Sequence, residues 1–460
     1  MGDDTPSDTF LASAESRYAD GTGGRMSSAT SEQQSTRIPD EIARAVVLPE
    51  SYGDETNITY PAFAWLRENM PVGQAFVDGY DPLWLITKFD DIMTVEKNHS
   101  LFNAGMNNPI LNTQAGDAFL RSLTPDGSTR YLDALPFLDP PEHTQVKAAT
   151  SNWFVPKNVA KYTERIRAIA REDVEKLLNY DGECDWATDF ALYYPLRVIL
   201  GLFGISQEDL PLMLQLTQDF FGANDPDEKR DDVDVSPETA ARQFQAAFAD
   251  FFAYFDRFTE DRRANPRDDL MSVIANAKVG GEFLPQATVN GSYLQVATAG
   301  HDTTSSTISG VAIAMARHPE QWQRVRADHS LIPKLVNEAV RWTSPVKHFM
   351  RSASEDTELH GVRIRKGERV MLNYPSGNRD EDYFTDADVF DLDRSPNKHL
   401  GFGFGGHMCI GQHIARLEME ILFEELASKI EKIELTGEPK PIKTNFVSSF
   451  KSVPVKFTKA

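Results

Sequence analysis

The stretch from Phe402 to Gly411 constrains the fold of this chain more than any other segment. Its glycines allow the backbone to turn tightly and bring N–H groups close to a bound group. The stretch holds Cys409, one of 2 cysteines in the protein, and leads into a helical pattern that begins at Gln412. Unpaired N–H groups and the helix dipole at a helix N-terminus favour the thiolate form of a nearby cysteine. We therefore expect a loop that presents an amide-cradled thiolate as a soft metal ligand.

The pattern Phe-x-x-Gly-x-x-x-Cys-x-Gly, formed by Phe402, Gly405, Cys409 and Gly411, resembles the haem-binding loop of cytochromes P450. This resemblance implies heme b with Cys409 as the axial thiolate ligand of the iron. It also implies the fold of that family, mainly α with small β-sheets (α+β), with one long helix crossing the domain over the haem. Taken alone, the stretch could equally be a glycine-rich turn around an inert cysteine.

Composition excludes several classes of function. The chain has 460 residues, 41% of them hydrophobic, which is enough for a large core. Its 2 cysteines, Cys184 and Cys409, suggest no disulfide framework and fit a reducing cytoplasm. A net charge of −22 argues against nucleic acid and anionic membrane as partners. Apolar stretches are too short to span a bilayer, and the N-terminus lacks the apolar region of a signal peptide.

Residues 1–36 are rich in Ser, Thr, Gly and Asp and are expected to form a disordered tail, in which Met26 is an alternative start. Residues 37–460 are expected to form a single domain. Apolar periodicity predicts helices over Phe89–Asn98, Asn158–Leu178, Asp189–Phe203, Leu210–Phe221, Pro237–Arg263, Ala287–Arg317, Pro319–His329, Ile332–Trp342 and Gln412–Lys429. Strands are predicted over Ala75–Val77, Leu83–Thr87 and within Val346–Asn373. The connection from Ser100 to Pro140 is long enough for a lid or binding loop, and the acidic run over residues 224–234 is expected to be a solvated turn.

The middle of the longest predicted helix is poor helix sequence, because glycine, Asp, Thr and Ser all weaken the hydrogen-bond ladder. The run from Ala299 to Thr304 resembles the oxygen-activating helix of P450 enzymes. The resemblance implies that Asp302 and Thr303 relay protons to bound oxygen, and that Ala299 and Gly300 lie against the haem. His301 is expected to bond away from the iron. Without the resemblance, a polar helix face with no chemistry would explain the same residues.

A Glu-x-x-Arg pair, Glu338 and Arg341, is similar to the helix motif of the same family. Such pairs are common on helices, so the position between the Thr-rich helix and the cysteine loop is what singles it out. The resemblance adds Arg394 as the third member of a buried structural network.

Haem propionates need cations. The resemblance assigns this role to His143, Lys147, Arg351 and His407, and assigns Phe402, Gly403 and Gly411 to haem contact. Arginine is commoner in the family at the position of Lys147. Lysine supplies a compact point charge where arginine supplies a bidentate fork.

The runs Ala299–Ser305, Glu338–Arg351 and His399–Glu420 are most similar to soluble bacterial P450s that hydroxylate the monoterpene α-terpineol. By analogy the substrate pocket is lined by Phe102, Met106, Leu111, Phe119, Gln295, Val346, His348, Phe446 and Val447. The mostly apolar lining implies a small hydrophobic substrate, either a monoterpene or an alkyl or aromatic hydrocarbon. We hypothesise that His348 contacts a substrate oxygen.

The chain shows no flavin or nicotinamide fingerprint. The resemblance therefore implies an iron-sulfur ferredoxin with an NAD(P)H-dependent ferredoxin reductase as the source of electrons, with O2 as co-substrate. Such ferredoxins are acidic, so Lys398, His413 and Arg416 near the cysteine loop are expected to dock one. Two alternatives to a monooxygenase remain on the sequence: a peroxide-driven peroxygenase and a non-catalytic haem-thiolate ligand binder.

Overall fold

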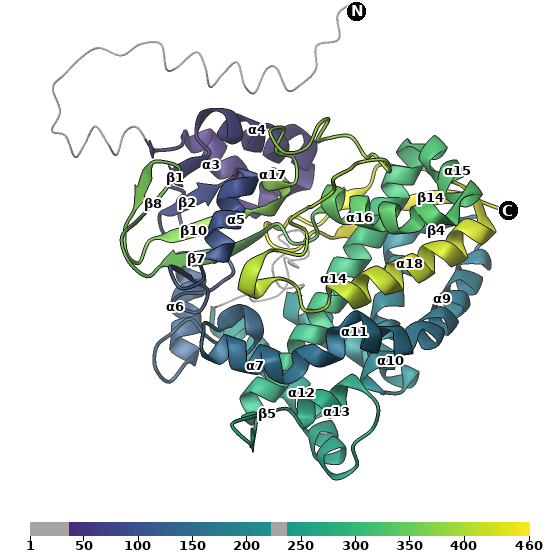
Figure 1. Ribbon diagram of the computed structural model, residues 1–460, viewed down its shortest axis with the longest axis horizontal. Helices are drawn as coiled ribbons and strands as arrows, with labels where there is room; N and C mark the ends of the chain where they lie inside the picture. Colours follow the sequence, from purple (N-terminus) through teal and green to yellow (C-terminus); the bar gives the residue numbers. More distant parts are fainter. Residues whose placement is uncertain (1–35, 222–236) are drawn as a thin grey trace, which may run out of the picture.

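The computed structural model describes residues 36–221 and 237–460. The expected tail, apart from Thr36, and the acidic run over residues 224–234 lie outside the described residues. Helices form most of the structure, and the largest sheet lies at one side of it (Figure 1). This arrangement confirms the predicted mainly α architecture with small sheets.

The largest sheet has the strand order β1-β2-β10-β7-β3. Its strands are β1 (Val72–Ala75), β2 (Leu83–Ile86), β10 (Arg369–Asn373), β7 (His348–Ala353) and β3 (Phe102–Asn103). Only β2 and β10 pair in parallel, and the other neighbours are antiparallel. Because β2 and β10 are far apart in sequence, this sheet ties the N-terminal third of the chain to the segment that precedes the cysteine loop.

A second sheet contains β11 (Ile430–Leu435), β14 (Pro454–Lys459) and β4 (Glu183–Asp185). Three two-stranded ribbons complete the described strands. They are β5 (Lys278–Val279) with β6 (Glu282–Phe283), β8 (Thr357–Leu359) with β9 (Val362–Ile364), and β12 (Lys440–Pro441) with β13 (Phe450–Ser452). Gly280 and Gly281 form the turn between β5 and β6.

The helices before the longest one are α3 (Asp40–Val47), α4 (Tyr60–Asn69), α5 (Phe89–Lys97), α6 (Gln114–Leu123), α7 (Glu142–Ser151), α8 (Pro156–Val159), α9 (Thr163–Leu178), α10 (Tyr194–Phe203), α11 (Leu210–Phe221), α12 (Pro237–Ala264) and α13 (Leu270–Ala275). After it come α15 (Pro319–Ala327), α16 (Ile332–Thr343), α17 (Tyr374–Gly377) and α18 (Gln412–Lys429). Within the described residues, no helix is both long enough and apolar enough to cross a membrane.

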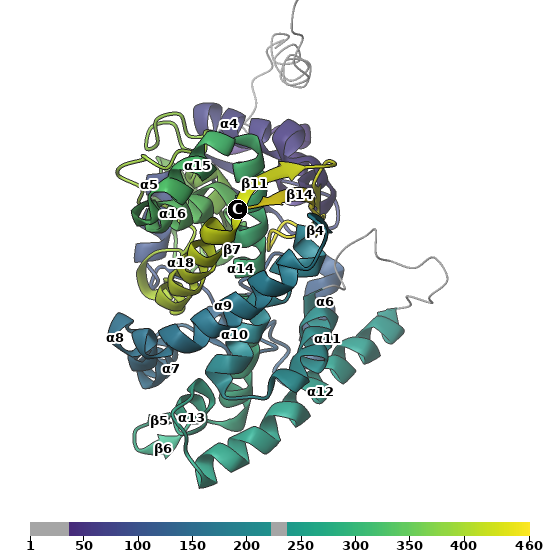
Figure 2. The same ribbon diagram turned by 90° about the vertical axis from the view of Figure 1, so that its right-hand side faces the viewer.

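The longest helix, α14 (Gln286–Arg317), has 32 residues and crosses the middle of the molecule (Figures 1 and 2). At a rise of 1.5 Å per residue it spans about 48 Å. It packs against α10, α12, α13, α16 and α18, and most of its length is buried. Its residues Ile308 and Val311 join the largest hydrophobic cluster, which also takes in α9, α10 and α18. The fold therefore holds the Thr-rich segment rigidly in its centre.

Several predicted segments differ from the structure. The strand predicted over Ala75–Val77 shares one residue with β1, and the helix predicted over Asn158–Leu178 is divided between α8, a 3-10 turn and α9. The long connection from Ser100 to Pro140 contains α6, whose start is capped by the Thr113 hydroxyl accepting from Gly116 N at 3.1 Å. The predicted helix Asp189–Phe203 is divided into a π-helical turn, Trp186–Ala191, and α10. Pro195 lacks the N–H that a continuous helix would use, and it stands in the first turn of α10.

Candidate functional site

The cysteine loop folds back on itself between Leu400 and α18. Cys409 N donates to Phe402 O at 2.8 Å, which closes the loop at its base. Gly403 and Gly405 have φ of +64° and +67°, a conformation that residues with a side chain rarely adopt. A Cβ at Gly405 would also lie 2.3 Å from the carbonyl oxygen of Glu96. The sequence needs glycine at these positions because the loop turns in the left-handed region and packs directly on the end of α5.

The thiol of Cys409 keeps accessible surface, whereas the protein excludes water from most of its surroundings. Burial raises the pKa of Cys409, and the backbone N–H groups of Gly411 and Gln412 act in the opposite direction. The predicted cradle of amides is therefore present, and in the free thiol its effect on the pKa is smaller than that of burial. A metal cation at the sulfur would restore the thiolate, because metal coordination deprotonates a thiol.

The Thr-rich part of α14 leaves one face accessible. Ala299 is exposed, and Asp302 and Thr303 are partly exposed, although Thr298, His301 and Thr304 beside them are buried. Thr303 Oγ1 donates to Ala299 O at 2.6 Å, so its oxygen lone pairs remain available as acceptors. The hydroxyls thus use carbonyls of the preceding turn, as predicted, while α14 stays continuous.

Asp302 stands beside His301 on this helix. Burial raises the pKa of Asp302, and the neighbouring imidazole of His301 partly opposes this rise. His301 Nδ1 lies 3.4 Å from Asp302 Oδ1, and its Nε2 bonds to Leu192 O at 2.7 Å. The prediction that His301 bonds away from the iron is thereby supported. Asp302 is a carboxyl that can hold or release a proton on the accessible face.

Basic side chains from three elements, His143 and Lys147 on α7, Arg351 on β7 and His407 of the loop, gather next to the cysteine loop. The rings of His143 on α7 and His407 lie 4.2 Å apart. Burial, Arg351, His143 and Lys147 together lower the pKa of His407 to about 2. Burial and Lys147 likewise lower the pKa of His143 to about 4. These mutual shifts mean that the groups face one another across short distances.

Such a cluster fits the carboxylates of a haem. Lys147 and Arg351 lower the pKa of the two histidines, and nearby propionate anions would raise it again and attract all four side chains. The accessible thiol of Cys409 and the accessible face around Ala299 are the other features that a bound haem needs. Lys147 is the weakest member, since its Nζ already donates to Gly406 O at 2.6 Å and Met408 O at 3.1 Å. It ties α7 to the cysteine loop.

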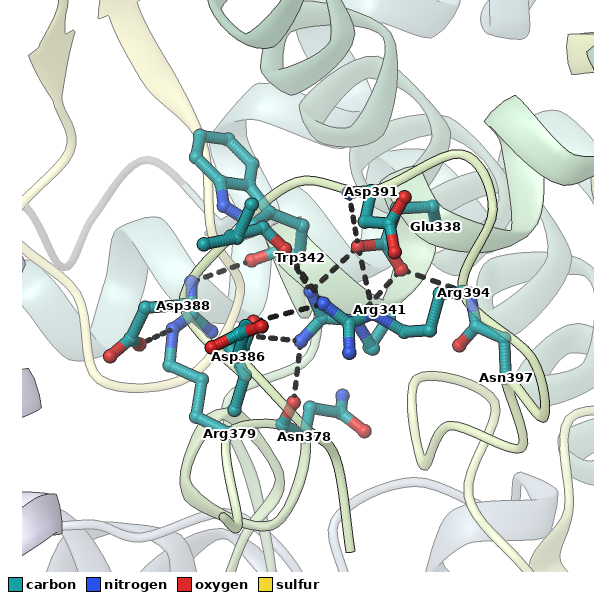
Figure 3. A network of polar contacts seen from close by, with 12 residues as sticks. Glu338, Arg341, Trp342, Asn378, Arg379, Asp386, Asp388, Asp391, Arg394 and Asn397 are labelled. Atoms are coloured by element: carbon teal, nitrogen blue, oxygen red, sulfur yellow. Dashed lines mark hydrogen bonds and ion pairs between the residues drawn. The ribbon is translucent and has the colours of Figure 1, made fainter.

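The predicted contact among Glu338, Arg341 and Arg394 is confirmed (Figure 3). Arg341 holds Glu338 with Nη2–Oε1 at 2.7 Å and Nε–Oε2 at 2.8 Å, and Arg394 Nε lies 3.2 Å from Glu338 Oε1. Asn397 Nδ2 and Asp391 N also donate to this carboxylate, each at 2.9 Å. All lone pairs of the buried charge are thus used, which is what makes such a network stable.

Some of the expected pocket residues are held in place by contacts with neighbouring segments, whereas others are not. Val346 and Val447 form an isolated antiparallel bridge, and the ring of Phe446 lies 5.6 Å from that of Phe349. Gln295 Oε1 accepts from Leu135 N at 3.1 Å, which fixes α14 against the connection after α6. The segments around Val346, Phe446 and Gln295 are therefore held in place, whereas Met106 is exposed. Leu111 is buried and Phe119 on α6 is partly buried.

One pocket expectation needs correction. His348 is fully buried, and both ring nitrogens are engaged: Leu111 N donates to Nε2 at 3.0 Å and Nδ1 bonds to Asn445 O at 2.7 Å. This leaves His348 no nitrogen for a substrate oxygen. Phe102 pairs with Ala353 between β3 and β7 and packs in the core with residues of α5. Val346, another expected pocket residue, packs against the same cluster.

Sequence reasoning missed three side chains near the site. His99 has a buried Nδ1 without a hydrogen-bond partner in the described structure and helps lower the pKa of His407. Glu96 is a buried carboxyl next to Arg351. Glu418 on α18 accepts from Thr304 Oγ1 at 3.0 Å, and burial raises its pKa to about 8. None of them stands in a pattern of residue types that marks a site, so only the fold reveals them.

Comparison with known proteins gives consistent matches. Residues 131–457 match the Cytochrome P450 family. The chain is 50% identical over 424 residues to Cytochrome P450-terp of a Pseudomonas species, which covers 92% of this chain and 99% of that protein. It is 30% identical over 418 residues to Linalool 8-monooxygenase of Pseudomonas putida, covering 88% of this chain and 97% of that protein. The crystal structure of CYP108D1 from Novosphingobium aromaticivorans superposes with a TM-score of 0.86 at 38% identity, covering 92% of this chain and all of that one.

Proposed function

The chain belongs to the cytochrome P450 family, and on that premise we propose that it hydroxylates a small hydrophobic compound of the terpene class. Membership makes it a P450 monooxygenase whose haem is held by an axial cysteine thiolate. We propose Cys409 as that ligand. The other cysteine, Cys184, lies on β4, and burial raises its pKa to about 12. A thiol with so high a pKa is a poor metal ligand, because the thiolate is the form that binds.

The observation that carries the proposed chemistry is the accessible pair Asp302 and Thr303 on a helix that is mostly buried. Haem bound at Cys409 supplies the site where O2 is activated. The chain itself delivers protons. Burial raises the pKa of Asp302 and so favours its protonated form, and the hydroxyl of Thr303 has free lone pairs to accept a proton and pass it on.

The propionates would be held by His143, Arg351 and His407, with Lys147 as a further cation. Gly300 and Ala299 leave room on α14, because neither has a bulky side chain. Phe402, Gly403 and Gly411 shape the loop on the side of the sulfur. Phe402 also carries the guanidinium of Arg416 4.3 Å above its ring, which anchors the start of α18 to the loop.

The substrate class rests on the relatives. Linalool 8-monooxygenase is named for a terpene alcohol, and the proposed pocket side chains of Val346, Phe446 and Val447 are apolar. Electrons are proposed to come from an iron-sulfur ferredoxin and its NAD(P)H-dependent reductase. Because such carriers work in the cytoplasm, we expect this protein there.

The test uses the purified haem-loaded protein and a panel of terpene alcohols, alkylbenzenes and aromatic hydrocarbons. Binding is read from the Soret shift, and product is then measured with ferredoxin, reductase and NAD(P)H or with peroxide alone. We expect terpene alcohols to give the largest shift and product only with the electron-transfer chain. Replacing Asp302→Asn should lower product formation by about 10²-fold while the Soret shift persists. Turnover with peroxide alone, or no turnover at all, would overturn the proposal in favour of a peroxygenase or a ligand binder.

A further inference from the structure

A buried carboxyl, Glu96, lies against the cysteine loop on the side of the largest sheet. It is near the end of α5, and its side chain is 2% exposed. A Cβ at Gly403 would come within 3.4 Å of Glu96 Oε1, and one at Gly405 would come within 2.3 Å of its carbonyl oxygen. The last turn of α5 and the loop therefore pack backbone to backbone. Because of this packing, movement of the Glu96 carboxyl displaces the loop that carries Cys409.

Three groups surround the carboxyl. Tyr374 on α17 donates its hydroxyl to Oε1 at 2.6 Å. Arg351 on β7 places Nη2 at 4.0 Å from the same oxygen, and the backbone N–H of Phe404 also favours the charged form. Oε2 is buried and has no hydrogen-bond partner in the described structure. Because a buried carboxylate normally has both oxygens bonded, this one is only partly compensated.

Arg351 lies between Glu96 and the side chains assigned to the propionates, so its positive charge can interact with either side. One guanidinium nitrogen, Nη1, donates to Met350 O at 2.8 Å, and Nη2 points toward Glu96. The same guanidinium lowers the pKa of His407, so it also faces the basic side chains that we assign to the propionates. An ionised Glu96 draws Arg351 toward α5 and cancels part of its charge. A neutral Glu96 leaves that charge to act on the haem edge.

We propose that Glu96 is a positioning residue that divides Arg351 between itself and the haem and thereby sets the reduction potential of the iron. This inference rests on the proposed haem site. Burial raises the pKa of Glu96 to about 7, against the opposing effects of Arg351, Tyr374 and Phe404. Both protonation states are then populated near neutral pH. With haem bound and reduced by an external one-electron donor, the Glu96 carboxylate would take up a proton from solvent to form its O–H bond, and no other bond would change.

The experiment measures the midpoint potential of the haem-loaded protein by reductive titration between pH 6 and pH 8. In the unmodified protein the potential should fall as the pH rises, because deprotonated Glu96 weakens the stabilisation of the reduced iron by Arg351. Glu96→Gln mimics the protonated form. We expect this variant to have a higher potential at pH 8 than the unmodified protein and a smaller dependence on pH. An unchanged potential with an unchanged pH dependence would overturn the proposal.

Tyr374→Phe provides a second, independent variant. It removes a donor that favours ionised Glu96, so the pH at which the potential changes should move upward. If that pH stays the same, the proposal fails even where Glu96→Gln does not load haem. Infrared difference spectra of the same titration should show the protonated carboxyl band, which is absent in Glu96→Gln; its persistence in that variant would contradict the assignment.

Asp269→Asn is the matched control. Asp269 is equally buried and bonds Arg262 at 2.8 Å, but it lies between α12 and α13 and not at the cysteine loop. It should lower stability and leave the potential unchanged; an equal shift in potential would mean general loosening and overturn the proposal. The reduced, carbon monoxide-bound spectrum separates the two levels of inference. A missing thiolate band in the unmodified protein refutes the haem site itself, whereas a normal band with no effect of Glu96→Gln refutes only the role of Glu96.

Discussion

At the scale of single residues, His348 shows how a position in the chain can mislead. It stands at the start of β7, where the related family places pocket residues, yet it joins two backbone segments and is fully buried. Leu111 N can only donate, so Nε2 is the acceptor and Nδ1 carries the hydrogen that bonds Asn445 O. Burial lowers the pKa of His348 to about 4, which is consistent with a neutral ring at pH 7.

Replacement of His348→Leu should therefore destabilise the protein. It leaves the N–H of Leu111 and the C=O of Asn445 buried without partners. Each unsatisfied group costs about 1–3 kcal/mol, so we expect the free energy of unfolding to fall by about 2–4 kcal/mol. Urea denaturation of the haem-loaded protein at pH 7 measures this loss. His318→Leu, at a more exposed histidine near Glu320, is the control and should change stability by less than about 1 kcal/mol. Equal stability of the two variants would refute the proposed role of His348.

At the scale of elements, α14 and α18 are joined by a buried polar contact between Thr304 and Glu418. Both helices carry residues of the proposed site, Asp302 and Thr303 on one and the cysteine loop just before the other. Tyr194 on α10 donates to the backbone carbonyl of Glu418 at 2.8 Å and holds the same turn of α18. A change in the charge of Glu418 thus acts on the contact between the two helices that enclose the site.

Stability should depend on pH through Glu418. Burial raises its pKa from 4.5 to about 8, so the folded protein binds a proton that the unfolded chain releases. The contribution of Glu418 to the free energy of unfolding is therefore full below pH 4.5 and is lost as the pH rises through about 8. Between pH 5.5 and 7.5 the unmodified protein should lose about 2 kcal/mol more than Glu418→Gln does. Urea denaturation of both proteins at the two pH values measures the difference. Parallel losses would show that Glu418 is ionised in the folded protein.

Elements with a strong local signal could be predicted from the sequence. Helix α18 matches its prediction at both ends, and α14 differs by one residue, since their apolar spacing is long and regular. The segment that became α6 was missed, because its start depends on one capping hydroxyl, Thr113, in a run rich in Asn and Gly. The candidate site likewise combines residues with a local sequence signal and residues brought together only by the fold. Motifs identified Cys409 and Asp302, but the partners of Glu96 come from elements far apart in sequence and needed the fold.

At the scale of the whole molecule, the negative net charge of the protein opposes the approach of the proposed electron donor. The protein carries a net charge of −22, and the ferredoxins that we propose as partners are acidic. Productive encounter then needs a local basic patch near the cysteine loop, as proposed for Lys398, His413 and Arg416. Lys398 and His413 are exposed, whereas Arg416 is half-buried and bonds Gln412 Oε1 at 2.9 Å. Lys398 is therefore the better candidate for a docking contact.

The two opposing charge effects act over different distances, and salt separates them. The screening length shrinks from about 30 Å at 0.01 M to about 10 Å at 0.1 M, so added salt first weakens the repulsion of the whole molecule and only later the contact attraction. The rate of reduction by an acidic ferredoxin should therefore rise and then fall with ionic strength, as measured by stopped-flow spectroscopy of the haem-loaded protein. Lys398→Glu should slow the reaction several-fold at the optimum. Lys456→Glu, exposed on β14, changes the net charge equally and should slow it much less. Equal slowing by both variants would mean that only net charge matters, and a rate independent of salt would rule out electrostatic docking at this face.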